Sequence, residues 1–471
     1  MCTRVATTMV MFGTLVRHTG GFGGPRVVLS GRALPLPWIH QLHRGASRSS
    51  GQLAHGTRSL SSSTAPHAAS TQGQQDVFDF ETRVDRADTG ALKWDKYAGK
   101  DVIPLWVADM DLKTAPAIVS AVRDRLDHGI FGYTSPTEGA QQAVMKYYKE
   151  RHGVEVPDKS WLFFTPGTVQ SMNAACAMLP ENASVMVIIP SYPPFFTSPK
   201  NTDRGLVTVP ADRAGGRWTF DWEAMETAMK ENPEVALFML CNPYNPVGRV
   251  FTAEELIRVG EFCVRHDLII VSDEIHCDLI LDQELKHISM LALDGGRFAD
   301  RTILLNAPSK TYNVPGLGCS YAIIPDKALR VGFAKAARGW VTQNSPLGYV
   351  GCEAAYNEGD PWRQALLEHL RGNRAALYAF MEERLPELRM DPMEATYLAW
   401  VDVRGLGWKS PGTEFERAGV GLTDGKTFLG EGYVRINFAC PRATLMEGLR
   451  RMEQAVISGY REKERPPPPP Q

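Results

Sequence analysis

The stretch Thr302-Ile-Leu-Leu-Asn-Ala-Pro-Ser-Lys-Thr-Tyr-Asn-Val-Pro-Gly-Leu-Gly318 decides the fold, because an apolar run in it leads to a single lysine. A second apolar run, residues 321–324, follows the glycines, so the pattern predicts strand, loop and strand, with Lys310 at the end of the first. A lysine held between two buried strands loses hydration, which lowers the pKa of its amine toward the range where it is nucleophilic. Such an amine is suited to forming a Schiff base with an aldehyde. An ordinary surface lysine is the alternative that this stretch alone leaves open.

Residues 161–324 extend the pattern into an alternation of short apolar runs and helical segments. The apolar runs are 162–164, 185–189, 206–209, 235–240, 268–271, 303–305 and 321–324. Helical spacing lies between several of them, at 168–178, 222–231 and 252–266. Continuous apolar strands that alternate with helices are typical of a mostly parallel sheet covered on both faces. The predicted fold class is therefore α/β, with a mostly parallel central sheet in a large domain and a smaller α+β domain.

The loops after these strands are the place to look for function, because ligands of such sheets bind at the carboxyl ends of the strands. After the first run, Gly167, Thr168 and Val169 open a helix, and their backbone N–H groups would form an anion site. After the second run, Tyr192 stands in a proline-rich turn where a flat ring could stack on it. After the fourth, two Asn-Pro pairs keep the backbone extended and hold the amide of Asn245 in place.

The next loop carries Asp273, whose carboxylate at a buried strand end needs a partner such as a pyridinium N–H. A metal site made from Asp273, Glu274, His276 and Cys277 is the alternative for this loop. With Lys310, the loops supply an anion site, an aromatic ring, an amide, a carboxylate and an amine. These are the groups that pyridoxal 5'-phosphate requires, so we predict this cofactor and no metal.

Changes in composition and pattern divide the chain into five expected parts. Residues 1–75 contain seven arginines, clustered serines and neither lysine nor acidic residues, which is the composition of an organellar transit peptide. The other expected parts are 76–124 as the N-terminal segment of the small domain, 125–350 as the large cofactor-binding domain, 351–460 as the C-terminal small domain and 461–471 as an exposed proline-rich tail.

Arg435 lies on a predicted strand of the small domain, where it could bind a carboxylate or form a structural salt bridge.

The composition limits the classes of function. The formal net charge is −2 and 22% of the residues are charged, which does not favour binding to nucleic acid or to a membrane surface. No apolar run is long enough to cross a bilayer. The eight cysteines are scattered without a C-x-x-C pair, which argues against a disulfide framework and a structural zinc site.

Eight segments resemble the motifs of a known family, and the resemblance covers residues 78–457. The segments are Trp106-Val-Ala-Asp-Met-Asp111, Phe131-Gly-Tyr133, Ser191-Tyr-Pro-Pro-Phe195, Asn242-Pro-Tyr-Asn-Pro-Val-Gly248, Ser272-Asp-Glu-Ile-His276, Ser309-Lys-Thr-Tyr-Asn313, Thr396-Tyr-Leu-Ala-Trp400 and Val434-Arg-Ile-Asn437. Together they resemble fold-type I pyridoxal-phosphate enzymes of the class I/II aminotransferase superfamily. More narrowly, the first and fifth segments resemble the MalY/PatB family of cystathionine β-lyase-type carbon–sulfur lyases.

The resemblance implies roles for individual positions. Lys310 would carry the cofactor, Asp273 would pair with the ring nitrogen, and Tyr192 would stack on the ring. Asn245 would contact the ring oxygen, and Arg435 would hold the α-carboxylate of an amino-acid substrate. The remaining implied contacts are His276 and Ser309 with the cofactor, Trp106 and Asp109 with the substrate, and Tyr133 with the phosphate of a neighbouring subunit, which would make the active unit a homodimer.

Two positions depart from the general aminotransferase pattern. His276 stands where a tyrosine is usual, and Gly318 stands where an arginine is usual. The second departure means that phosphate contacts must come from other groups.

The resemblance also implies a reaction, the β-elimination of L-cystathionine or another cysteine S-conjugate to a thiol, pyruvate and ammonia. The residues themselves do not separate this reaction from that of an aminotransferase, which shares its early steps. A non-catalytic scaffold that kept the fold is the alternative of another class. The expected partners are a small amino-acid substrate and a second copy of the chain, with no nucleic acid and no membrane.

Residues 1–75 should direct import into a mitochondrion or a plastid and then be removed, since their composition is that of a transit peptide. Composition does not distinguish the two organelles, and a cytoplasmic protein that keeps the segment is the alternative. N-terminal sequencing of the protein isolated from cells should find a first residue beyond Met1 and no later than Val77. Protein that begins at Met1 in the cytosolic fraction would overturn the expectation.

Overall fold

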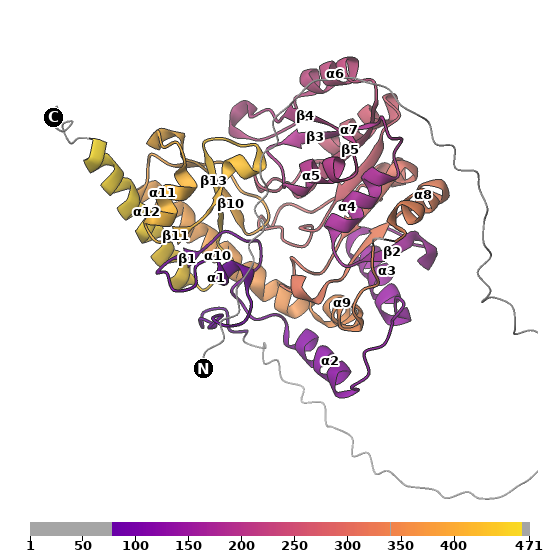
Figure 1. Cartoon of the computed structure of the whole chain (residues 1–471), viewed down its shortest axis with the longest axis horizontal. Helices are drawn as coiled ribbons and strands as arrows, with labels where there is room; N and C mark the ends of the chain where they lie inside the picture. The colour runs from indigo at the N-terminus through magenta and orange to yellow at the C-terminus, as the bar shows by residue number, and fades with distance from the viewer. Residues whose placement is uncertain (1–77, 340, 464–471) are drawn as a thin grey trace, which may run out of the picture. The chain divides into compact units, whose positions relative to one another are not determined.

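The computed structural model of this protein describes residues 78–339 and 341–463, which Figure 1 shows as a coloured ribbon. The expected transit peptide, residues 1–75, lies outside the described residues, as do residues 464–471. The proline-rich tail is expected from residue 461, but helix α12 (Arg442–Lys463) continues through the first part of it. The helix can continue there because the first proline, which cannot donate a helical hydrogen bond, comes only at position 466.

A seven-stranded sheet organises the larger part of the structure, in the order β2-β8-β7-β6-β5-β3-β4. Its strands are β2 (Leu162–Thr165), β3 (Ser184–Ile189), β4 (Gly205–Pro210), β5 (Val235–Cys241), β6 (Ile269–Asp273), β7 (Thr302–Asn306) and β8 (Ser320–Ile323). Strand β8 runs antiparallel to its neighbours β2 and β7, and the other neighbouring pairs are parallel. Each apolar run of the sequence coincides with one strand, and the predicted α/β fold with a mostly parallel sheet is confirmed.

Helices accompany the strands of this sheet, as Figure 1 shows for α4, α5 and α7. They are α3 (Glu138–His152), α4 (Thr168–Ala177), α5 (Pro194–Asn201), α6 (Trp222–Glu231), α7 (Ala253–Arg265) and α8 (Lys327–Ala337). Helix α7 shows how the sequence sets such a helix in place. The Thr252 hydroxyl accepts a hydrogen bond from the Glu255 N–H, and the Glu255 carboxylate accepts one from the Thr252 N–H, which forms a capping box. Leu256, Val259 and Phe262 then lie on one buried face against the core of the sheet.

A second part of the structure contains an antiparallel sheet in the order β12-β13-β10-β9. Its strands are β9 (Arg389–Met390), β10 (Leu398–Asp402), β12 (Thr423–Asp424) and β13 (Tyr433–Asn437), and a separate parallel pair consists of β1 (Ile103–Pro104) and β11 (Val420–Gly421). The remaining helices are α1 (Leu92–Asp95), α2 (Pro116–Asp127), α9 (Pro346–Glu358), α10 (Asp360–Arg384) and α11 (Pro411–Arg417). A hydrophobic core of its own joins β10 and β13 to α10 and α12. Within residues 78–339 and 341–463, no helix is both long and apolar enough to span a membrane.

One predicted element differs from the structure. The apolar residues that lead to Asp109 and Asp111 predict a short strand from Ile103 to Asp111, but only Ile103 and Pro104 pair as a strand. Further along, backbone carbonyls of this segment accept hydrogen bonds from side chains, among them those of Arg435 and Lys310. Backbone groups satisfied in this way do not need a neighbouring strand, so the segment remains irregular.

Candidate active site

Strands β2, β3, β5, β6 and β7 run in the same direction, so their carboxyl ends meet at one edge of the sheet. At this edge Cys241 of β5 is paired with Asp273 of β6, which is paired in turn with Leu305 of β7. The segments that leave the edge carry, in chain order, Gly167, Tyr192, Asn245, Asp273 and Lys310. The five loops that the sequence singles out therefore leave the sheet at the same edge.

Lys310 follows the end of β7 and is half-buried. Its Nζ donates a hydrogen bond to the backbone carbonyl of Ala108 at 2.8 Å. Burial, helped by the positive charge of Arg435, lowers the pKa of the Lys310 amine to about 8, although Asp109 and Asp273 oppose the shift. Near neutral pH a useful fraction of the amine is therefore uncharged, the form that acts as a nucleophile or base.

Asp273 is the last residue of β6 and is buried, with 3% of its surface exposed. Its Oδ1 accepts a hydrogen bond from the backbone N–H of Ile275 at 3.2 Å. Burial raises the pKa of this carboxyl to about 7, and the Ile275 N–H and the charge of Lys310 only partly offset the effect. Within the described part of the chain, no cationic side chain lies at ion-pair distance from it, so a cationic N–H of a ligand would be its natural partner.

Arg435 lies on β13 and is buried, with 6% of its surface exposed. Its guanidinium donates to Oδ1 of Asn245 and to the carbonyl of Trp106, both at 3.1 Å. Its Nε has no hydrogen-bond partner, and no described carboxylate lies within ion-pair distance of the guanidinium. The ring of Phe428 lies against the guanidinium, with its centroid 4.5 Å from Cζ. The structural salt bridge that the sequence leaves open is therefore absent among the described residues. Burial lowers the pKa of the guanidinium to about 10, and a carboxylate ligand would relieve its desolvation.

Six other predicted cofactor positions belong to the loops and the helix start near this edge. His276 is buried with its Nδ1 unpartnered among the described residues, and burial, then the charges of Lys310 and Arg435, lower the pKa of its imidazole to about 3. It is therefore neutral. Burial raises the pKa of the Tyr192 hydroxyl, whose nearest charges are those of Asp273 and Arg435. Gly167 precedes the first residue of α4, Thr168, and no side chain caps this helix start, which leaves its N–H groups for an anion. Val169 in the first turn of α4 and Ser309 beside Lys310 are both half-buried, and their roles stay predictions.

Residues 106–112, which we call the strap, meet both Lys310 and Arg435 through backbone carbonyls. The side chains of Trp106 and Asp109 bind the N-terminal segment instead. The Trp106 indole donates to the carbonyl of Lys93 at 3.0 Å, and Oδ2 of Asp109 accepts from Arg86 at 2.8 Å. Oδ1 of Asp109 is buried without a partner among the described residues. A side-chain contact of Trp106 or Asp109 with substrate stays a prediction.

Tyr133 lies in an irregular segment after α2 and is fully exposed. It buries no surface against its own chain, and its contact with the phosphate of a neighbouring subunit stays a prediction. The helix before it shares this exposure. In α2 Ile118 is buried, whereas the apolar side chains of Val119 and Leu126 are 41% and 48% exposed.

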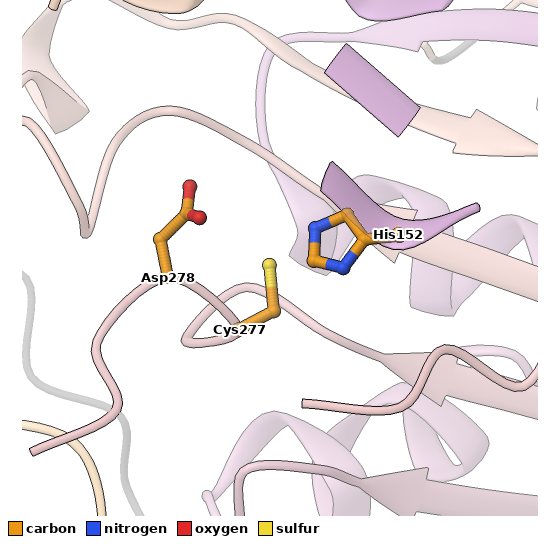
Figure 2. A group of neighbouring side chains, drawn as sticks. All are labelled: His152, Cys277 and Asp278. Carbon is orange, nitrogen blue, oxygen red and sulfur yellow. The ribbon is translucent and has the colours of Figure 1, made fainter. Parts of the chain in front are cut away.

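The alternative of a metal site at residues 273–277 has no support in the geometry. Within the described residues, the metal-binding types that gather are His152, Cys277 and Asp278 (Figure 2). These three converge on the hydroxyl of Tyr147, at 3.0 Å from His152 Nε2, 3.3 Å from Cys277 Sγ and 2.8 Å from Asp278 Oδ2. One hydroxyl can donate one hydrogen bond and accept two, so the phenol can bind all three side chains, while Oδ1 of Asp278 lies 3.6 Å from Arg151 Nε.

Sequence reasoning assigned no role to three residues that contact the strap. Tyr397 donates to the carbonyl of Ala108 at 2.9 Å, the same oxygen that Lys310 uses. Asn313 and Asn437 bind the strap through their side-chain amides. All three stand in the segments that carried the resemblance, but only the fold shows what their side chains reach.

The family model of aminotransferase class I and II matches residues 100–452. The chain belongs to the aminotransferase class I and II family. The family member PatB of Bacillus subtilis, a cystathionine β-lyase, is 36% identical over 392 residues, which cover 80% of this chain and 99% of PatB. The resemblance to the MalY/PatB group is thereby confirmed.

Solved structures agree with this family assignment. The crystal structure of OvoB is 40% identical and superposes with a TM-score of 0.78, covering 81% of this chain and all of OvoB. Cystalysin from Treponema denticola, whose structure contains pyridoxal 5'-phosphate, is 33% identical with a TM-score of 0.77, covering 81% of this chain and 99% of cystalysin.

In this family member, Asp273→Asn should remove a pH-dependent loss of stability from the cofactor-free protein. The folded-state pKa of Asp273, about 7, lies above the ordinary value of 3.8, so the folded state holds the proton more tightly than the unfolded state. The free energy of unfolding of the wild type should therefore fall by up to about 4 kcal/mol as the pH rises from about 4 to about 7. Asparagine keeps the acceptor for Ile275 and does not titrate, so this part of the slope should disappear.

Chemical denaturation at a series of pH values measures the slope. The matched control is Asp203→Asn, at an exposed aspartate, which should keep the wild-type slope. Equal slopes in all three proteins would show that Asp273 does not titrate as a buried acid.

Proposed function

We propose that this protein is a pyridoxal-phosphate-dependent carbon–sulfur β-lyase that eliminates a thiol from L-cystathionine or another cysteine S-conjugate. The observation that carries the proposal is that Lys310, Asp273 and Arg435 meet around one sheet edge, and none has an ion-pair partner among the described residues. Unpaired charges in such surroundings are costly unless a ligand completes them. An amine, an acid and a guanidinium match an aldehyde, a ring N–H and a substrate carboxylate.

The residues at this edge fit the cofactor. Lys310 would bind its aldehyde, and the uncapped start of α4 at Gly167 would hold its phosphate. Asp273 would accept the ring N–H, and Asn245 and the neutral His276 would lie toward the ring oxygen, with Tyr192 against the ring. When bound, pyridoxal phosphate supplies an aldehyde that captures the substrate amine and a ring that accepts electrons from Cα. The relatives support this assignment, since cystalysin, 33% identical, contains this cofactor.

Lys310 performs the proton transfer. When its Nζ is not bound to the cofactor, it would be available as a base, and a pKa of about 8 leaves part of it unprotonated near neutral pH. It removes the proton from Cα of the substrate. Loss of that proton allows the Cβ–S bond to break, and the thiolate leaves with the bonding electron pair and takes up a proton. The remaining three-carbon fragment is hydrolysed to pyruvate and ammonia.

Arg435 orients the substrate for this step. A carboxylate that binds its guanidinium would use the unpartnered Nε and relieve the desolvation that now lowers its pKa. The contacts from Asn245 and Trp106 hold the guanidinium in one orientation, so the carboxylate is fixed and the Cα–H bond is held toward Lys310.

An aminotransferase is the alternative, because it uses the same groups up to removal of the Cα proton. The lyase is favoured by the relatives, since PatB is a cystathionine β-lyase that matches along almost its whole length. A non-catalytic scaffold is disfavoured because the buried Asp273 and Arg435 and the half-buried Lys310 would then be kept without a partner at a cost in stability.

Incubation with L-cystathionine, with and without a 2-keto acid, should distinguish these functions. The lyase should release pyruvate, ammonia and a thiol without any keto acid, and its rate should fall by at least about 1,000-fold in Lys310→Ala, which lacks the base and the cofactor linkage. Turnover only with a keto acid, and formation of a new amino acid, would establish the aminotransferase. A wild-type protein that takes up no pyridoxal phosphate and turns over nothing would establish the scaffold.

We also propose that the active unit is a homodimer in which Tyr133 completes the phosphate site of the neighbouring subunit. Tyr133 is fully exposed, and Val119, Leu126, Ile130 and Phe131 nearby in sequence are 41–67% exposed. A cluster of exposed apolar side chains of this kind is suited to being covered by another protein surface.

Mixing inactive Tyr133→Ala and Lys310→Ala proteins tests this assembly. A hybrid dimer contains one site with both lesions and one site with neither. Each hybrid dimer should therefore have up to about half of the activity of a wild-type dimer. Subunit exchange is followed by mass spectrometry with one variant isotopically labelled. Complete exchange without recovered activity would contradict a shared site.

We further propose that residues 1–75 are an import signal for a mitochondrion or a plastid. Their arginine- and serine-rich composition supports this, and the N-terminal sequencing described above decides it.

A further inference from the structure

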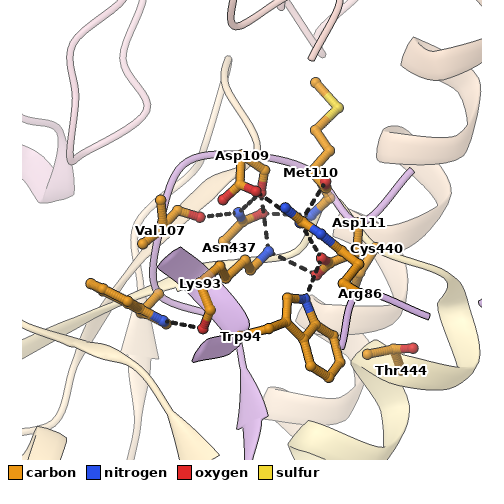
Figure 3. Close-up of polar contacts among 12 residues, drawn as sticks. Arg86, Lys93, Trp94, Val107, Asp109, Met110, Asp111, Asn437, Cys440 and Thr444 are labelled. Carbon is orange, nitrogen blue, oxygen red and sulfur yellow. Dashed lines mark hydrogen bonds and ion pairs between the residues drawn. The ribbon is translucent and has the colours of Figure 1, made fainter. Parts of the chain in front are cut away.

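The strap is held almost entirely by side chains. Its carbonyls at Trp106, Ala108 and Met110 accept hydrogen bonds from Arg435, Lys310 and Asn313, respectively. Figure 3 shows the middle of the strap, where further carbonyls meet Lys93 and Asn437. An irregular segment fixed in this way has its position set by the groups that grip it.

Asn313 grips the strap beside the lysine. It lies three residues after Lys310, and its amide makes three hydrogen bonds to strap backbone. Oδ1 accepts from the N–H of Met110 at 2.9 Å, and Nδ2 donates to the carbonyls of Met110 at 3.0 Å and Leu112 at 2.8 Å. Both amide hydrogens are thereby used. Its backbone is left-handed, with φ of 57°, a conformation that asparagine tolerates better than most residues.

Asn437 grips the strap beside the arginine. It lies two residues after Arg435 at the end of β13 and is fully buried. Nδ2 donates to the carbonyls of Val107 and Asp109, the latter at 2.7 Å, and Oδ1 accepts from the N–H of Ala439 at 2.9 Å. This amide also uses both of its hydrogens.

Charged residues anchor the opposite side of the strap (Figure 3). Asp111 accepts from Lys93 and Arg86, both at 2.8 Å, and from the Trp94 indole at 2.9 Å. Burial alone would raise the pKa of Asp111, but these donors hold it below its usual value. Arg86 also bridges to Asp109, so the strap is tied to the N-terminal segment through an ion-pair network.

We propose that Asn313 and Asn437 are positioning residues that keep the strap in register with Lys310 and Arg435, so that one piece of backbone sets the spacing between amine and guanidinium. Each functional residue is bound to the strap directly and is followed within three positions by an asparagine bound to the same strap. The effect on turnover rests on the function proposed above, whereas the effect on the Lys310 amine does not. The strap therefore connects the group that removes the proton to the group that holds the carboxylate.

Asn313→Gly isolates the asparagine on the lysine side. Glycine adopts positive φ without strain, so the variant loses the amide and adds no backbone conflict. Asp203→Gly is the matched control, because Asp203 has φ of 55° and is exposed. In cofactor-free protein, reductive methylation of Lys310, followed by peptide mass spectrometry against pH, reports the state of its amine.

Loosening the strap should let water reach Lys310. The midpoint of its methylation profile should therefore rise from about 8 toward 10.5 in Asn313→Gly, and stay at the wild-type value in Asp203→Gly. With cofactor and L-cystathionine, kcat of Asn313→Gly should fall by about 10- to 100-fold with KM changed less than about threefold.

Asn437→Ser tests the arginine side, since the shorter hydroxyl side chain stays polar but cannot reach both carbonyls that the amide binds. It should raise KM by about tenfold and lower kcat less, because the carboxylate grip is what it disturbs. If this buried variant does not fold, Asn313→Gly decides alone. A wild-type methylation midpoint in folded Asn313→Gly, with kcat and KM within about threefold of the Asp203→Gly values, would overturn the proposal. A wild type that releases no thiol would refute the proposed function, while the methylation midpoint would still test the positioning role.

Discussion

The cost of keeping ionisable groups away from water without partners is the constraint on which this structure depends. Asp273 and Arg435 are buried and Lys310 is half-buried, and the pKa of each is shifted in the direction that favours its neutral form. Their opposite charges do not cancel, because none comes within ion-pair distance of another. The fold can bear this cost because the groups are held by the end of β6, the middle of β13 and a loop after β7. A ligand that pairs with all three would recover the lost interactions, so the same constraint that costs stability favours binding.

The strap shows how a segment without regular structure can be part of such a rigid site. A β-ladder would satisfy its carbonyls by pairing with a neighbour, but would leave Lys310 and Arg435 without these acceptors. Two asparagine amides and the two functional cations take the place of the ladder. The ion-pair network of Asp111 with Lys93 and Arg86 supports the strap from the other side. The strap thus links Arg86 and Lys93 to Lys310 and Arg435 through hydrogen bonds and ion pairs.

The sequence predicts the sheet and its functional edge well, because both depend on local patterns. Apolar runs identify all seven strands of the large sheet, and the loops after five of these runs identify what reaches the edge. The strap is predicted wrongly as a strand, since an apolar run cannot show that its backbone is bound by side chains more than 180 residues away, such as Lys310. For the same reason the roles of Asn313 and Tyr397 escape notice. The unpaired state of Arg435 is also invisible in sequence, because it depends on which carboxylates the fold places elsewhere.

The segment from Asp273 to Asp278 explains why a metal site is a reasonable but unsupported interpretation of the sequence. Its polar residues face two different environments. The charge of Lys310 acts on the pKa of Asp273 and on that of His276 at the candidate site. Glu274 accepts from Ser272, Ser289 and the N–H of Met290 and contacts His287 at 2.9 Å, while Cys277 and Asp278 bind Tyr147. Glu274, Cys277 and Asp278 use these hydrogen bonds to anchor the segment. Asp273 and His276 remain as the members that can respond to a ligand. A run of potential metal ligands can therefore be one part structural support and one part binding site, and only the hydrogen-bond partners separate the two.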